Sequence, residues 1–199
     1  KITYLPIIDT TVRLANLKSG GIDLTERILA TDIPSVKADP KLKLANSVSL
    51  AWFGLMVNQH NGPKADNPFG QDPRLWKAFD LALDREVINQ VVFNGAFVPG
   101  NQWVSPQNPY YQADFPVPKR DIAKAKALVK ESGARTPIVI DYMVNNAPEG
   151  RAVAEVVQSM VAEAGFELKI RVVEVATALK AGENGDFQLY GLTWSGRSD

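Results

Sequence analysis

The hydrophobic positions of residues 70–95 recur at helical spacing, and this stretch carries the clearest pattern in the chain. Asp72 followed by Pro73 predicts a helix start, because aspartate suits the N-cap and proline at the first helical position lacks an N–H that would have no partner there. Asn94-Gly95 predicts a left-handed cap at the end. The pattern predicts two packed amphipathic helices joined at a charged corner, with these inward positions: Leu75, Trp76, Phe79, Ala82, Leu83, Val87, Ile88, Val91 and Val92.

The N-terminal third contains shorter patterns, some typical of strands and some typical of helices. Residues 1–8 predict a buried strand, and Asp9 and Thr10 are cap candidates for a following helix that Gly20-Gly21 ends. Further short strands are predicted over residues 22–24, 41–45 and 52–58, and a short helix is predicted to begin at residue 32.

The C-terminal half reads as strand, helix and strand in succession. The predicted elements are a helix over 119–132, a strand over 136–143, a helix over 148–164, a strand over 166–174, a short helix over 176–181 and a last strand over 187–194. Strand, helix and strand with short joints imply a parallel pair with a right-handed crossover. The predicted fold class is therefore α/β, a mixed sheet with βαβ units flanked by helices.

One irregular loop interrupts these elements. Residues 100–118 interleave four prolines with Trp103, Tyr110, Tyr111 and Phe115. A loop of this length with aromatic residues is usually either functional or packed as a flap over the core, and the sequence leaves both interpretations open.

Composition narrows the class of protein. The chain has 199 residues with 45% hydrophobic composition, for which we expect a single domain. Lys+Arg and Asp+Glu number 22 each, so no field of one sign favours nucleic acid as a partner. The absence of cysteine excludes disulfides and thiolate metal sites.

Known catalytic and cofactor motifs are missing from the sequence. His60 is the only histidine, and neither a G-x-S-x-G elbow nor a cysteine nucleophile exists. Zinc needs three or four ligands, and one imidazole is too few. No G-x-G-x-x-G fingerprint occurs. We therefore predict no catalytic residues, no metal site and no cofactor.

Two arginines and three tryptophans are the candidate ligand-binding residues. Arg151 falls in the first turn of a helix that follows a parallel strand, where open α/β sheets bind ligands and where helix N-terminal amides favour anions. The alternative is a surface pair with Glu155. Arg197 follows the last predicted strand and is either a ligand contact or a hinge residue that bonds backbone carbonyls. Flat apolar walls are offered by Trp52, Trp103 and Trp194, although tryptophan more often lies in a core.

Four separated segments resemble one known family. They are residues 72–95 (DPR-x-x-x-A-x-x-x-A-x-DRE-x-I…G), 17–23 (LKSGGID), 118–133 (P-x-x-D-x-A-x-A-K-A-L-V-K-E-S-G) and 186–199 (D-F-x-x-x-x-x-x-W-S-G-R-S-D). These segments resemble the motifs of the large extracytoplasmic solute-binding proteins of ABC importers, the peptide/nickel-binding family 5. The sequence departs from the family at Gly21 and Trp76, where glutamate and arginine are usual, and Arg197 departs from the peptide-binding members, which have an aspartate near this place.

The resemblance implies a solute-binding function outside the cytoplasm. Residues 1–199 would form one lobe of a two-lobed periplasmic-binding-protein architecture of type II, with 1–8 and 187–199 crossing to the missing second lobe at the hinge. The partners would be a small peptide-like, anionic or zwitterionic solute and an ABC permease in the membrane. Arg151 matches the arginine that holds the solute carboxylate in peptide-binding members, and Arg197 in place of aspartate favours an anionic group. The alternatives are a small α/β hydrolase or transferase and a structural interaction domain.

Overall fold

The computed structural model describes residues 1–48 and 50–195, and the chain divides into two compact units. The first unit comprises residues 1–48 and 89–98, and the second comprises the remaining described residues. Each unit is described by itself below.

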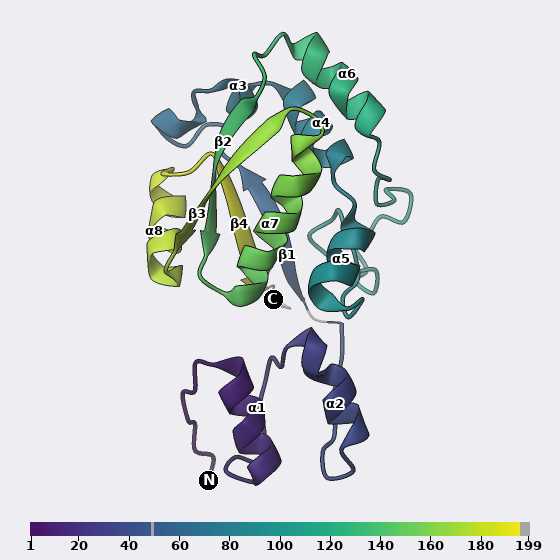
Figure 1. Ribbon diagram of the computed structural model, residues 1–199, viewed down its shortest axis with the longest axis vertical. Coiled ribbons are helices and arrows are strands. Elements are labelled where there is room, and N and C mark those ends of the chain that lie inside the picture. Colours follow the sequence, from purple (N-terminus) through teal and green to yellow (C-terminus); the bar gives the residue numbers. More distant parts are fainter. Residues whose placement is uncertain (49, 196–199) are drawn as a thin grey trace. The chain divides into compact units, whose positions relative to one another are not determined.

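A four-stranded mixed sheet forms the centre of the second unit (Figure 1). Its strands are β1 (Ala51–Val57), β2 (Ile138–Asn145), β3 (Phe166–Val173) and β4 (Leu189–Ser195), in the order β1-β4-β2-β3. β2 pairs in parallel with both β3 and β4, whereas β1 pairs antiparallel with β4. The predicted α/β class with a mixed sheet and a parallel βαβ pair is confirmed.

Two helices connect the parallel strands. α7 (Pro148–Ala162) joins β2 to β3, and α8 (Val175–Asn184) joins β3 to β4. Since β3 and β4 lie on opposite sides of β2, right-handed crossovers place the two helices on opposite faces of the sheet. Figure 1 shows α7 and α8 on either side of β2 and β3.

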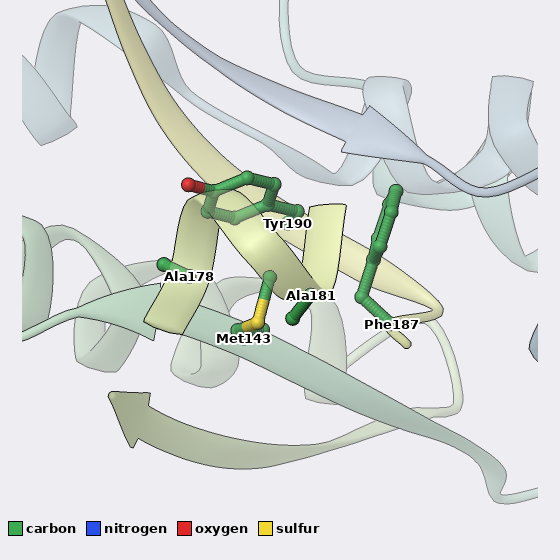
Figure 2. Packing of buried hydrophobic residues seen from close by; sticks show 5 residues of the cluster. All are labelled: Met143, Ala178, Ala181, Phe187 and Tyr190. Atoms are coloured by element: carbon green, nitrogen blue, oxygen red, sulfur yellow. The ribbon is translucent and has the colours of Figure 1, made fainter. Parts of the chain in front are cut away.

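The face under α8 carries a compact apolar cluster. Met143, Ala178, Ala181, Phe187 and Tyr190 are all buried and point toward one another in Figure 2. The rings of Phe187 and Tyr190 are 5.7 Å apart and meet edge to face. Because side chains alternate along a strand, Tyr190, Leu192 and Trp194 share this face of β4.

The remaining helices of the second unit pack beyond the sheet. They are the 3₁₀-helix η2 (Pro63–Ala65), α3 (Pro68–Gln71), α4 (Pro73–Ala82) and α6 (Ile122–Ser132). α4 begins as predicted, with the Asp72 side chain accepting a hydrogen bond from the Arg74 N–H at 2.9 Å. Phe69, Phe79 and Phe166 form a ring cluster with centroids 5.4 to 6.0 Å apart, which joins α3 and α4 to β3.

α5 (Arg85–Phe93) follows the charged corner and departs in part from its prediction. The predicted inward residues Val87 and Val91 are exposed, and the buried position is Asn89. Its side chain donates to the Phe97 carbonyl at 2.8 Å and accepts from the Phe97 N–H at 3.1 Å, so it fixes the turn after the helix. The predicted left-handed Gly95 is confirmed, with φ of 71°.

The first unit contains helices where helices were predicted but no strands. It holds α1 (Thr10–Ser19), the 3₁₀-helix η1 (Ala30–Asp32) and α2 (Ile33–Ala38). The strands predicted over 1–8, 22–24 and 41–45 are wrong, since these residues pair with no strand of the described chain. Arg13 gives one physical reason, because its Nη1 donates to the carbonyls of Ile7 and Ile8 at 2.9 and 3.1 Å and occupies acceptors that a sheet would use.

Candidate functional site

Three strand ends meet at one edge of the sheet. β2 and β4 run parallel, so their carboxyl ends lie at the same edge, and antiparallel β1 begins there. Trp52 lies directly opposite Trp194 in this register, and Ala51 lies opposite Ser195. In open α/β sheets ligands bind outside the carboxyl ends of the strands, at the point where the crossovers leave to opposite faces. The carboxyl ends of β2 and β4 lie side by side at this edge, and α7 leaves the end of β2.

The turn from β2 into α7 is built by two small or polar residues. The Asn145 Oδ1 accepts a hydrogen bond from the Ala147 N–H at 3.0 Å. A Cβ on Gly150 would lie only 3.2 Å from the same Oδ1, so a glycine keeps the first turn of the helix close to the strand end. The sequence analysis missed both residues, although Asn-Asn-Ala-Pro before a helical stripe is a turn signal.

Arg151 lies in the first turn of α7, at the carboxyl edge as predicted. The helix has Ala147 at its N-cap, with no side-chain cap hydrogen bond. The Arg151 side chain is exposed and makes no hydrogen bond or ion pair within residues 1–48 and 50–195, so the alternative pairing with Glu155 is not formed. An uncapped helix N-terminus beside an unpaired guanidinium suits a carboxylate or phosphate.

The tryptophans gather at the same edge. The rings of Trp52 and Trp103 have centroids 6.2 Å apart and are tilted by 42°. The Trp52 indole lies along its own strand over Gly54, where a Cβ would come within 2.6 Å of Cζ3 and 2.9 Å of Cε3. Trp103 is 82% exposed and Trp194 is 55% exposed, so neither is a core residue.

The loop over residues 100–118 is closed by its own amide side chains. The Asn101 Nδ2 donates to the Pro116 carbonyl at 3.0 Å, and the Gln102 Nε2 donates to the Gln112 carbonyl at 2.8 Å. The Gln112 N–H donates back to the Gln102 Oε1 at 3.0 Å. Trp103, Tyr110 and Phe115 remain exposed, so these aromatic residues do not pack into the core. Of the two interpretations of the loop, the structure excludes burial of these side chains in the core.

Arg197 lies outside the described residues, and its proposed role remains a prediction. β2 and β4, the strands that precede Arg151 and Arg197 in the chain, run parallel and end at the same edge of the sheet.

A charged network occupies the other end of the α8 face. Lys64 contacts Asp141 and Asp186 at 2.8 and 2.9 Å, and Arg171 contacts the two Asp141 oxygens at 3.0 and 3.1 Å. Burial works to raise the pKa of Asp141, but the hydrogen bonds from Arg171 and Lys64 outweigh it and lower that pKa below its ordinary value. The hydrogen bond to Asp141 raises the pKa of Lys64. The two cations and the two carboxylates balance, so the network joins η2, β2, β3 and the segment before β4. It went unnoticed in the sequence.

Other candidate chemistry is sparse in the described part of the chain. No group of three or more His, Cys, Asp or Glu side chains gathers there as a metal site would require, and no helix there is long and apolar enough to cross a membrane. An open groove of about 460 Å³ runs between α7 and the edge strand β3. The Gln158 Nε2 donates to the Leu168 carbonyl beside it at 2.7 Å, and this groove does not include the carboxyl-edge residues.

Solved structures of binding proteins share this fold. The periplasmic binding protein DppA from Helicobacter pylori, in complex with the peptide STSA, has a TM-score of 0.82 at 22% identity, over 96% of this chain and 36% of that chain. The oligopeptide-binding protein AppA from Bacillus subtilis, in complex with a nonapeptide, has a TM-score of 0.76 at 25% identity, over 95% and 40%. The fold is therefore that of part of a periplasmic binding protein.

Sequence comparison then gives the family. Residues 1–199 match the bacterial extracellular solute-binding proteins, family 5 Middle, and the chain belongs to this family. It is 27% identical over 193 residues to a dipeptide-binding protein of Escherichia coli and 26% identical over 195 residues to a probable di/tripeptide-binding protein of Pseudomonas aeruginosa. The chain spans 35% of the length of these two relatives. The family resemblance read from the sequence is confirmed.

Proposed function

We propose that this chain is part of the solute-binding component of an ABC importer, which captures a small peptide-like or other anionic or zwitterionic solute between two lobes. The protein acts in the periplasm or another extracytoplasmic space, and its macromolecular partner is an ABC permease. It performs no chemistry. The family and the binding proteins among its relatives support this proposal over the small α/β enzyme or the interaction domain.

The observation that carries the proposal is Arg151 at the carboxyl edge. Its guanidinium is exposed and unpaired within the described residues, beside the uncapped N-terminus of α7. A solute carboxylate held there gains charge-assisted hydrogen bonds, each worth about 1.5 to 3 kcal/mol. The remaining proposed contacts are Trp52, Trp103, Trp194 and Arg197.

The crossing between lobes is proposed at the ends of β1 and β4. A two-lobed binder needs neighbouring strands that lead to the other lobe, and Ala51 lies opposite Ser195 at one edge of the sheet. Residues 1–8 form no strand, and their predicted crossing to the missing lobe stays a proposal. Residues 187–199 keep the role predicted for them.

Calorimetry on the full-length protein tests the function. We expect di- and tripeptides to bind, and Arg151→Ala to weaken binding about tenfold or more, with the melting temperature of the unliganded protein nearly unchanged. A peptide with an amidated C-terminus should lose a similar part of its affinity and show little further loss with the variant.

Arg135→Ala is the matched control. Arg135 is also exposed and unpaired within the described residues, but it precedes β2 and therefore belongs to the opposite edge of the sheet. Its removal should leave affinity unchanged. Equal affinities of the wild type and Arg151→Ala for the free-acid peptide would contradict the proposed role of Arg151.

A further inference from the structure

Three indoles from separate parts of the second unit meet at the carboxyl edge. Trp52 comes from β1, Trp194 from β4 and Trp103 from the loop that precedes α6. Trp52 is the central member, because it is the cross-strand neighbour of Trp194 and the ring neighbour of Trp103. The sequence separates them by up to 142 residues (194 − 52), so only the fold brings them together.

The arrangement is fixed before any solute arrives. Gly54 leaves the space in which the Trp52 indole lies along the strand, and a Cβ there would collide with the ring. The hydrogen bonds of Asn101 and Gln102 across the loop fix the segment that carries Trp103. Aromatic surface held in place in this way binds without the ordering of flexible side chains that weakens association.

The surroundings of the indoles are uncharged along the chain. The residues next to each of them are Ala51, Phe53, Gln102, Val104, Thr193 and Ser195. A cationic group bound on an indole face is usually held by a carboxylate as well, and none adjoins the three rings in sequence. The exposed faces of Trp103 and Trp194 therefore suit a flat apolar group, for which offset or edge-to-face ring contacts are favourable.

We propose that Trp52, Trp103 and Trp194 form a subsite for an aromatic side chain of the solute, so that the protein selects peptides with a phenyl, phenol or indole group. This inference rests on the proposed peptide-binding function and adds the class of side chain. Arg151 at the same edge holds the carboxylate of the peptide, and the indoles hold the ring. Selectivity then arises from one charged contact common to all peptides and one apolar contact that only some peptides make.

A tripeptide series on the full-length protein tests this selectivity. Phe, Leu, Lys or Ala is placed in turn at each position of an otherwise all-alanine tripeptide, and each affinity is measured by calorimetry. At one position we expect Phe to bind about tenfold more tightly than Ala, with Leu between them and Lys no better than Ala. Trp103→Ala should abolish most of the gain of Phe over Ala, a ratio that is measured within the variant itself.

Tyr110→Ala is the control on the same loop. Tyr110 is as exposed as Trp103, at 82%, but its ring makes no contact with another aromatic ring of the described residues. Its removal should leave the gain from Phe intact. Peptides that bind without preference, a preference for Lys, or a gain from Phe that survives Trp103→Ala would each overturn the inference while the peptide-binding function stands. A full-length protein that binds none of the peptides would overturn both.

Discussion

The two ends of the sheet in the second unit differ in whether their polar side chains are hydrogen-bonded and their aromatic side chains are exposed. At the amino edge, where β2 and β4 begin and β1 ends, polar side chains bond one another and the backbone. At the carboxyl edge, Arg151 is unpaired within the described residues and two indoles are exposed. The same strands end at both edges, so the difference between the edges comes from the residues that lie there. The side chains of the first edge stabilise the fold, and the second edge carries the binding site that we propose.

Asn58 shows how completely the amino edge is satisfied. It is 3% exposed, and its Nδ2 donates to the carbonyls of Asn61, Gly185 and Phe187 at 2.8 to 3.1 Å. Its Oδ1 accepts from the Asn61 N–H at 2.9 Å. One side chain thus joins the end of β1 to the segment between α8 and β4. Nothing comparable joins the described residues of the carboxyl edge.

The largest expected effect is on the amino edge, with Asn58→Ala. The change removes these hydrogen bonds and leaves buried carbonyls without partners, which should lower the free energy of unfolding by about 2 to 4 kcal/mol. Urea denaturation of the full-length protein measures it. Asn58→Asp should be at least as destabilising, because a carboxylate would face three carbonyl oxygens. A loss below about 0.5 kcal/mol in both variants would break the comparison.

A smaller effect is expected for the charged network. Asp141→Asn should lower stability at neutral pH by about 1 to 3 kcal/mol, since Asp141 is partly buried and accepts bonds from two cations. Its pKa is lowered in the folded state, so its contribution is present above the unfolded pKa and is lost as the pH falls through the folded value. The difference between wild type and variant should therefore begin to narrow below about pH 4 and should disappear once the pH lies below the lowered pKa of Asp141.

Asp186→Asn provides the comparison within this network. Asp186 contacts the same Lys64 and Arg171, but its side chain is 57% exposed, so we expect a loss of less than about 1 kcal/mol. Equal losses for the two variants would show that burial does not set the strength of these pairs. A gap for Asp141→Asn that is the same at pH 3 and pH 7 would contradict the lowered pKa of Asp141.

The smallest stability effect is expected at the carboxyl edge. Trp103→Ala should change the unfolding free energy of the unliganded protein by no more than about 0.5 kcal/mol, because the side chain is mostly exposed. The same variant is expected to have the largest effect on the preference for aromatic peptides. A strong destabilisation would instead identify Trp103 as part of the core and remove the contrast between the two edges.

Local pattern was enough to predict most of the second unit. The strand, helix and strand over residues 136–174 alternate cleanly, and α4 has both its cap and its stripe, so β2, α7, β3 and α4 follow from sequence. Arg151 could be placed at the carboxyl edge for the same reason, because the order of β2 and α7 decides its position. The grouping of Trp52 with Trp194 required the register of β1 against β4, which no local pattern contains.

The wrong or missing predictions all depended on contacts that the local sequence pattern does not contain. Residues 1–8 have strand-forming composition, but a strand needs a partner, and Arg13 takes their carbonyls instead. Val87 and Val91 fit an apolar stripe, yet Asn89 is the buried residue because a turn eight residues further on satisfies its amide. Asn58 and Asp141 were overlooked because their partners lie 127 and 30 residues away in the chain.

Positions 52 and 54 should change together in evolution, because the Trp52 ring lies over Gly54. A side chain at position 54 would collide with the indole, and a smaller residue at position 52 would leave Gly54 without the ring that covers it. Neither change is tolerated as easily alone as when the other accompanies it. Relatives that prefer other solutes should therefore differ at both positions at once, with bulk moving from one residue to the next on the same face of the strand.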